Sequence, residues 1–366
     1  TRQMMLQMAA NQGWRLKKGD VSGAFLQGRE YPDLLHCVPC DEICAAMGIE
    51  PGSVTRLRRA CYGLVDAPLE WYKTVDEFLV ELGLKRTWSD ACAWIWVKDG
   101  ITRGMVSGHV DDFLFGGKEE DQEWQAILSK IREKFKWGDW EEGEFVQCGV
   151  TIKQVREGFE LSQPRYLDDV SEIGVNATRR KDRESPLSER EKSALRALLG
   201  GLSWHAQQVA PHLSAEVSLL LSEISQGTVQ TIIKANTLLH HAKARKDHVM
   251  KIHKLEGEIA MYAWVDAASQ NRMGGGSTQG ILVGASSRSL ERGDVCPISP
   301  MCWHSNKIDR ACRSPGAAET QAAVNGEDVL YYARYQWSEL HGHPVDVRDV
   351  YDKVTTEVLT IKGAEK

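Results

Sequence analysis

The stretch "GMVSGHVDDFLFGG" (104–117) places two adjacent aspartates, Asp111 and Asp112, between two apolar runs. Two carboxylates in contact repel each other unless something neutralises them. Successive side chains of a strand point to opposite faces, so both can serve one site only at a tight turn, which predicts a hairpin with the pair at its tip. Because Mg²⁺ binds one or two carboxylates together with substrate phosphates, the pair indicates a divalent-cation site. The competing interpretation is an ordinary surface turn.

Asp20 is a third candidate ligand, because it ends the short extended run "WRLKKGD" (14–20). If that run lies at a neighbouring strand end, three carboxylates complete a two-metal centre. Such a centre holds the attacking and leaving oxygens in phosphoryl or nucleotidyl transfer. A nucleotidyltransferase and a metal-dependent nuclease are both compatible with these residues alone.

The elements that must position these carboxylates can be read from the periodicity of apolar residues. Helical spacing begins at Leu69 and continues to about residue 84, and residues 124–137 form an amphipathic helix. Residues 91–100 form a strand that ends in a turn, and residues 143–163 form two strands around "REG". The first half of the chain is therefore expected to combine β-strands and helices.

The pattern of apolar residues changes after about residue 180, from strands mixed with helices to helices alone. Residues 187–227 and 229–246 are helical, with Pro211 and Gly227 as breaks. From Gly257 strands return, followed by a helix opened by "RSPGAAETQAA" (313–323), for which Ser314 suits the N-cap and Pro315 the first helical position. The chain is expected to be α+β.

Composition sets broad limits. The 366 residues, with 42% hydrophobic and 26% charged side chains, fit a soluble globular protein of two or three domains. No apolar run approaches the length of a membrane span. Nine scattered cysteines favour a reducing compartment over a disulfide framework. The net charge of −6 argues mildly against nucleic-acid binding, but four basic clusters allow a locally basic cleft. They are residues 15–19, 56–59, 179–183 and 240–248.

Four blocks, in this order and at these intervals, resemble the reverse transcriptase of copia-type LTR retrotransposons. They are "DVSGAFLQG" (20–28), "LRRACYGLVDAPLEWY" (57–72), "HVDDFLFGG" (109–117) and "LSQPRYLDDV" (161–170). The resemblance spans nearly the whole chain. It implies a palm with partial fingers and a primer grip (1–180), a helical thumb or connection (181–255) and a C-terminally truncated RNase H-like domain (256–366).

The resemblance also assigns residues. Asp20, Asp111 and Asp112 match the polymerase triad that binds Mg²⁺ or Mn²⁺. Phe25 matches the bulky gate that excludes a ribose 2′-hydroxyl, a group that separates RNA from DNA. The remaining matches are Gly63 and Pro68, beside the incoming nucleotide and template base, and residues 145–150, at the primer grip. The implied partners are an RNA or DNA template-primer and deoxynucleoside triphosphates. A larger polyprotein and no membrane are also implied, with copying in cytoplasmic particles and integration in the nucleus.

Three departures from the family pattern bear on activity. His109 replaces the usual Tyr before the aspartate pair. Between residues 65 and 70, two positive charges of the family are lost and two negative ones, Asp66 and Glu70, are gained, which is expected to weaken nucleic-acid binding. The chain starts only 19 residues before Asp20, so the basic fingers strands are expected to be missing. An inactive or co-opted element fragment that binds nucleic acid without synthesis is therefore the alternative.

The last third resembles the family's RNase H block. Asp266 ends the strand "IAMYAWVD", Glu319 lies on the expected helix, and Asp346 is the third match, although Asp349 offers another register. These carboxylates would hold two metals that direct water at an RNA phosphodiester. Because a fourth carboxylate is expected on a later helix, nuclease activity is expected to be impaired or absent. A domain that only packs is the alternative.

Two other motifs have simpler interpretations. "CVPCDEIC" (37–44), next to His36, has C-x-x-C spacing, but it suits tetrahedral zinc ligation poorly. "MGGGSTQG" (273–280) lacks the ending of a phosphate-binding loop, and a hairpin turn is expected there.

Overall fold

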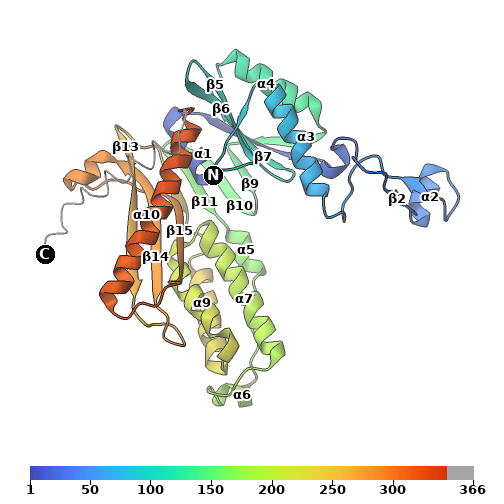
Figure 1. The fold of residues 1–366 in the computed structure, drawn as a ribbon. Coiled ribbons are helices and arrows are strands. Elements are labelled where there is room, and N and C mark those ends of the chain that lie inside the picture. Colours follow the sequence, from blue (N-terminus) through green and yellow to red (C-terminus); the bar gives the residue numbers. More distant parts are fainter. Residues whose placement is uncertain (344–366) are drawn as a thin grey trace. The chain divides into compact units, whose positions relative to one another are not determined.

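The computed structural model describes residues 1–343, and these residues divide into two compact units (Figure 1). The 14–142 unit comprises residues 14–142 together with 340–343. The 143–339 unit comprises residues 143–339 together with 1–13. The predicted boundary near residue 180 does not coincide with this division, because the strands that follow residue 143 belong with the later helices and sheets.

A six-stranded antiparallel sheet forms the base of the 14–142 unit, with strand order β4-β5-β6-β7-β1-β8. Its strands are β1 (Arg15–Val21), β4 (Lys85–Arg86), β5 (Ala93–Lys98), β6 (Ile101–His109), β7 (Asp112–Gly117) and β8 (Trp137–Glu142). The first strand in sequence lies between β7 and β8. The run that ends at Asp20 therefore lies beside the hairpin that carries the aspartate pair.

Two helices, α3 (Ala67–Glu81) and α4 (Gln122–Lys134), cover one face of this sheet. Both confirm the helices predicted from apolar spacing. Trp124 of α4 lies directly on the sheet because Gly104 and Gly117 have no side chain: a Cβ on either would come within 2.3 or 2.2 Å of the indole. A bulky residue there would lift the helix from the strands.

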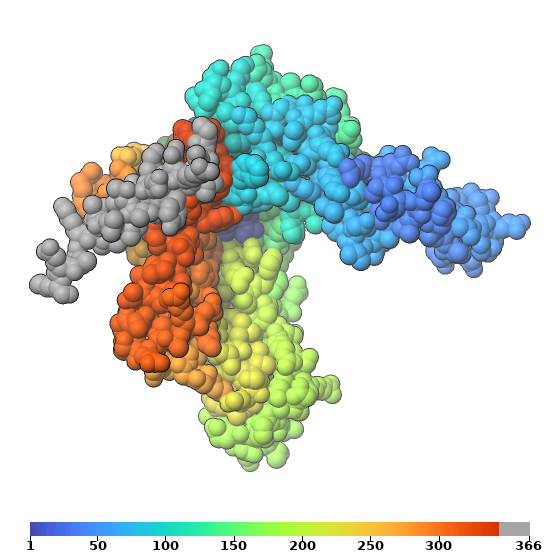
Figure 2. Space-filling model, in the orientation of Figure 1, coloured from blue at the N-terminus to red at the C-terminus, as the bar shows by residue number. Residues whose placement is uncertain are grey.

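Between β1 and α3 the chain makes a small projection (Figure 1 and Figure 2). It contains the 3₁₀ turn η1 (Ala24–Gln27), β2 (His36–Cys37), α2 (Asp41–Met47) and β3 (Thr55–Arg56), with β2 and β3 paired. Of these elements, η1 contributes to the core shared with α3 and the main sheet, where Ala24 is fully buried.

The 143–339 unit begins with a four-stranded sheet, order β12-β11-β10-β9. Its strands are β9 (Glu144–Gln147), β10 (Val150–Val155), β11 (Gly158–Ser162) and β12 (Met250–His253), and α1 (Arg2–Gln12) packs against it. Where two strands were predicted before residue 163, three occur. Cys148 and Gly149, with φ of 47° and 73°, form a two-residue turn that divides the first predicted strand.

The helices of this unit confirm the helical stretch predicted after residue 180. They are α5 (Pro164–Asp169), α6 (Ala177–Lys181), α7 (Glu189–Gln208), η2 (Pro211–Leu213), α8 (Ser214–Glu223), η3 (Ile224–Gln226) and α9 (Val229–Ala244). A leucine-rich core holds all of them except α6 together, since α6 has no buried residue, and Pro211 breaks the chain where predicted.

A three-stranded antiparallel sheet and a long helix complete the unit. They are β13 (Ile259–Ala268), β14 (Thr278–Ser287), η4 (Arg288–Arg292), β15 (Ser299–Lys307) and α10 (Pro315–Leu340). The predicted helix start is confirmed, since the Ser314 hydroxyl accepts a hydrogen bond from the Ala317 amide at 3.1 Å. The glycine-rich stretch leads from a turn into β14, as predicted. Among residues 1–343, no helix has the length and apolar character to cross a membrane.

Candidate functional site

The aspartate pair lies at the tip of the β6–β7 hairpin. His109 pairs with Asp112, so Val110 and Asp111 form a two-residue turn. Val110 has φ of 59°, a left-handed conformation that is strained for a β-branched residue. The Trp71 indole of α3 donates a 2.5 Å hydrogen bond to the Val110 carbonyl and holds the turn. Strained backbone of this kind is concentrated at functional sites.

Asp20 joins the pair across the β1–β7 ladder. Its Cα partner is Asp112, and the Val21 amide donates a 2.8 Å hydrogen bond to the Asp111 carbonyl. Residues directly opposite in antiparallel strands point to the same face, with Cβ atoms about 5 Å apart. The three predicted polymerase ligands therefore come from one end of two adjacent strands, and Asp20 and Asp112 share one face.

Sequence reasoning missed two charged residues on that face, Lys18 and Glu141. Lys18 is 5% exposed, and its Nζ donates to the Asp20 carboxylate and, at 3.1 Å, to Glu141 Oε1. Burial alone would lower the pKa of Lys18, but the hydrogen bonds to Asp20 and Glu141 outweigh it and raise that pKa. The ammonium is therefore kept charged. Alternation along "KKGD" was the available signal, because it places Lys18 with Asp20 and Lys17 with Gly19.

The opposite face of β1 is aromatic. Trp140 stacks on Phe115 with ring centroids 4.5 Å apart, and Trp137 packs edge-on against both rings. A Cβ on Gly19 would lie 3.0 Å from the Trp140 indole. A side chain at Gly19, next to Asp20, would therefore crowd the tryptophans on the far face.

No three His, Cys, Asp or Glu side chains gather closely enough to hold a metal ion anywhere in residues 1–343. This covers the polymerase triad and the cysteine-rich stretch 36–44. At the triad the backbone brings the residues together, while the Asp20 carboxylate is paired with Lys18.

The residues matched to nucleotide binding surround the start of α3. The ring of Phe25, in η1, lies 4.7 Å from the ring of Tyr62. Gly63 has φ of 101°, which favours glycine, and Pro68 occupies the first turn of α3. Phe25 and Tyr62 therefore bring η1 and the loop before α3 together.

The two acidic departures in this loop both have hydrogen-bond partners within the protein. The Tyr31 hydroxyl donates a 2.6 Å hydrogen bond to Asp66, and this bond raises the pKa of Tyr31 to about 12. Glu70 is 4% exposed and accepts from Arg29 at 2.7 Å and Lys73 at 2.9 Å, which lowers its pKa. Since Glu70 is paired with two cations, its share of the expected repulsion of a template is reduced, whereas Asp66 keeps its negative charge.

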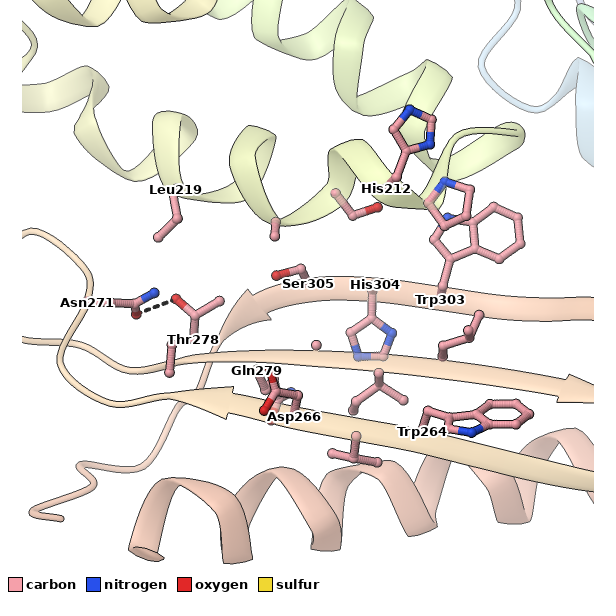
Figure 3. Close-up of a pocket in the computed structure, with 18 residues that line it drawn as sticks. His212, Leu219, Trp264, Asp266, Asn271, Thr278, Gln279, Trp303, His304 and Ser305 are labelled. Atoms are coloured by element: carbon pink, nitrogen blue, oxygen red, sulfur yellow. Dashed lines mark hydrogen bonds between the residues drawn. The ribbon is translucent and has the colours of Figure 1, made fainter. Parts of the chain in front are cut away.

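The RNase H candidates lie on separate parts of the third sheet and its helix. Asp266 pairs with Gly280, whereas its neighbour Val265 lies against Gly326 of α10. Asp266 thus faces away from α10, into a pocket between the sheet and α8 that Figure 3 shows. Glu319 is exposed on α10, and Asp346 lies outside the described residues. The structure does not bring Asp266 and Glu319 together.

A protein-family model described as reverse transcriptase (RNA-dependent DNA polymerase) matches residues 2–187. The chain belongs to the reverse transcriptase family. The resemblance predicted from the four sequence blocks is confirmed. Reverse transcriptases generally use divalent metal ions.

Curated relatives of this reverse transcriptase are transposon polyproteins. It is 25% identical over 342 residues to the retrovirus-related Pol polyprotein from transposon RE1 of Arabidopsis thaliana, and 24% identical over 342 residues to that from transposon RE2. Each alignment covers 90% of this chain and 22% of the relative. A third, from transposon TNT 1-94 of Nicotiana tabacum, is 27% identical over 173 residues, 46% of this chain and 12% of the relative. The chain thus spans about a fifth of the two Arabidopsis relatives.

Among solved structures, a foamy viral protease-reverse transcriptase in complex with an RNA/DNA hybrid is similar to this chain. The sequence identity is 14% and the TM-score is 0.47, over 89% of this chain and 37% of the viral one.

Proposed function

We propose that this chain is an RNA-directed DNA polymerase of a copia-type retrotransposon, which adds deoxynucleotides to a primer on an RNA or DNA template. One observation carries the proposal: the strand register places Asp20 opposite Asp112 and beside the turn that contains Asp111. The family match over residues 2–187 supports the same assignment. We further propose that the chain works within a longer Pol polyprotein, in cytoplasmic particles and in the nucleus.

The donor set suits Mg²⁺ or Mn²⁺, since hard cations take carboxylate oxygens and complete their shell with substrate phosphates. The register supplies two carboxylates on one face, and the Lys18 ammonium beside them marks a place that attracts positive charge. Asp20 and Asp112 would hold the ion, with Asp111 at the turn as the third ligand. When bound, a divalent ion neutralises charge that develops on the reacting phosphate.

The remaining residues position the reactants. The Trp71 hydrogen bond fixes the turn, so Asp111 is held before substrate arrives. Phe25 would exclude a ribose 2′-hydroxyl, and Gly63 and Pro68 would shape the loop beside the incoming nucleotide and template base. The β9–β10 hairpin, which contains Cys148 and Gly149, would hold the primer terminus.

For the last third we propose an RNase H-like domain without nuclease activity. The order of β13, β14 and α10 agrees with the predicted strands and helix, and β15 is an additional strand that was not predicted. The register that separates Asp266 from α10 does not support a metal site shared with Glu319. Polymerisation is therefore the activity to test.

The test is primer extension on poly(rA)/oligo(dT) with Mg²⁺, comparing the chain with Asp111→Asn. Asp99→Asn is a matched control, because Asp99 also lies in a two-residue turn, at the other end of β6. We expect extension by the parent and by Asp99→Asn, and a loss of at least 100-fold in Asp111→Asn, since an oriented carboxylate contributes on the order of 3 kcal/mol to such sites. Equal extension by all three proteins would contradict the assignment of the triad.

The alternative is a chain that keeps the fold and binds nucleic acid without synthesis. The pairing of Asp20 with Lys18 is the observation that favours it. Under this alternative the parent would bind an RNA/DNA hybrid in a mobility-shift assay and extend no primer at any Mg²⁺ or Mn²⁺ concentration.

A further inference from the structure

Lys18 is a buried cation next to the carboxylates that are proposed to hold the metal. We propose that Lys18 is a tethered counter-cation of the active site, which neutralises Asp20 in the absence of metal and competes with the divalent ion for that carboxylate. The inference rests on the proposed function, since it concerns the metal requirement of the same site. It assigns Lys18 as a positioning residue that acts through Asp20.

The first support is the strand geometry. Lys18 and Asp20 are two residues apart on β1 and so point to one face. Across the ladders, Lys18 is opposite Glu141 of β8, and Asp20 is opposite Asp112 of β7. One ammonium is thus placed among three carboxylates by the sheet itself, with no dependence on a flexible loop.

The second support is burial. A lysine that is 5% exposed is costly unless it is paired, and here two carboxylates accept its hydrogen bonds. Lys17 provides the contrast: it points to the other face, its side chain is 21% exposed, and it pairs with Glu142 at 3.1 Å. Lys18 is therefore held at the carboxylates, whereas Lys17 belongs to a peripheral ion pair.

The consequence is a competition between two cations. While Asp20 accepts from Lys18, fewer of its lone pairs are available to a metal, and the ammonium repels a divalent ion. Loss of the lysine charge should therefore tighten metal binding and loosen the metal-free protein. A lysine whose role is only to pack would give the second effect without the first.

The test is Mn²⁺ binding by isothermal titration calorimetry, without nucleic acid, on the parent, Lys18→Met and Lys17→Met. Asp111→Asn identifies the part of the signal that comes from the triad. We expect Lys18→Met to lower the Kd for Mn²⁺ roughly tenfold, and Lys17→Met, which removes the same charge on the same strand, to stay near the parent. Unchanged or weaker binding by a folded Lys18→Met, or equal tightening by both variants, would overturn the proposal.

A second measurement decides the case if Lys18→Met folds but is too unstable for the titration. Thermal unfolding in EDTA is compared for the parent, Lys18→Met, Asp20→Asn and the double variant. If Lys18 and Asp20 neutralise each other, the double variant melts well above Lys18→Met, because Asp20 no longer carries an unpaired charge, while the loss of the Glu141 contact is common to both variants. If the double variant loses the sum of both single losses, Lys18 acts by packing and the proposal fails.

The same variants and measurements distinguish a failure of this inference from a failure of the proposed function. If Asp111→Asn binds Mn²⁺ like the parent and no protein extends a primer, the polymerase assignment fails. The unfolding cycle in EDTA still reports whether Lys18 and Asp20 are coupled, because it needs neither metal nor activity. If the unfolding comparison shows coupling but Lys18→Met does not change Mn²⁺ binding, Lys18 and Asp20 form an ion pair that does not compete with the metal, and the proposal fails.

Discussion

At the scale of single residues, Val110 is held in a backbone conformation that valine rarely adopts. The β6–β7 turn needs a positive φ at this position, and a glycine would adopt it without strain. With valine at this position, the turn is held instead by the hydrogen bond from Trp71 and by the neighbouring strands. The turn therefore imposes the strain on Val110, and the same turn fixes the position of Asp111.

We expect Val110→Gly to raise the free energy of unfolding by about 1 kcal/mol, since it relieves that strain. Primer extension should fall, because a glycine turn holds Asp111 less firmly. The measurements are urea denaturation and extension on one preparation. Gln270→Gly is the control: Gln270 also has a positive φ, of 51°, but lies in the β13–β14 turn. It should gain stability and keep extension. A gain in both properties for Val110→Gly would show that the strain has no role at the site.

The sequence indicated the aspartates at this scale but not their neighbours. The hairpin follows from local pattern, since two apolar runs flank Val110 and Asp111. The partners of Lys18, Asp66 and Glu70 could not be predicted, because Glu141, Tyr31 and Arg29 are 123, 35 and 41 residues away in sequence. Alternation gives the face of a side chain, but only the register gives the residue across from it.

At the scale of elements, the contact between α4 and the sheet decides whether the hairpin that carries Asp111 and Asp112 is supported on its covered face. Trp124 is 1% exposed and lies across β6 and β7, on the strands that lead to Val110. The capping of α4 fixes the first turn of the helix, because Asp121 accepts from the amides of Glu123 and Trp124. The helix start and the two strands thus meet at one indole.

Gly117→Ala tests this contact. Its Cβ would lie 2.2 Å from the Trp124 indole, so the helix must shift, and we expect a loss of about 1–3 kcal/mol in the free energy of unfolding. Gly138→Ala, on β8, is the matched control, since its nearest neighbour would be 3.7 Å away, and it should change stability little. The measurement is urea denaturation followed by tryptophan fluorescence. Equal losses for both would mean that strand glycines matter here for reasons other than this indole.

The types of most elements could be predicted from the periodicity of apolar residues. The predictions were wrong where one or two residues changed the direction of the backbone. The predicted helices at 69–84 and 124–137 are α3 and α4, because an apolar stripe of helical spacing is sufficient to place a helix. The division of the predicted strand at Cys148 was missed, since a cysteine gives no turn signal before its glycine. Separation of Asp266 from α10 was also missed, because it depends on which face of β13 the helix covers.

At the scale of the whole molecule, the described chain has two compact units, each with a hydrophobic core. The proposed metal site belongs to the 14–142 unit. In the 143–339 unit, a buried histidine makes stability depend on pH. His205 is 5% exposed, and burial lowers its pKa to about 4, with a smaller contribution from His212. Gln163 selects the tautomer of the neutral ring: the amide Nε2 donates to the Gly149 carbonyl, so Oε1 accepts from His205 Nδ1–H at 3.0 Å.

The sign of the pH effect follows from these two protonation states. An unfolded histidine binds its proton near pH 6.5, whereas folded His205 does so only near pH 4. The contribution of His205 is thus complete above pH 6.5 and is lost as the pH falls toward 4, by up to about 3 kcal/mol at 1.4 kcal/mol per pKa unit. Because His205 belongs to the 143–339 unit, acid should lower the stability of that unit. Mn²⁺ should raise the stability of the 14–142 unit, which contains the proposed metal site.

Differential scanning calorimetry can separate these effects, because two cores give unfolding that is not two-state. We expect two transitions at pH 7. Mn²⁺ should raise the melting temperature of one, and a change to pH 5 should lower that of the other, more strongly in the parent than in His205→Gln. His240→Gln, which changes an exposed histidine, should follow the parent. The two perturbations act on different cores because the carboxylate cluster lies on β1 and β7 and the histidine on α7. A single transition that both conditions move together would show that the units unfold as one.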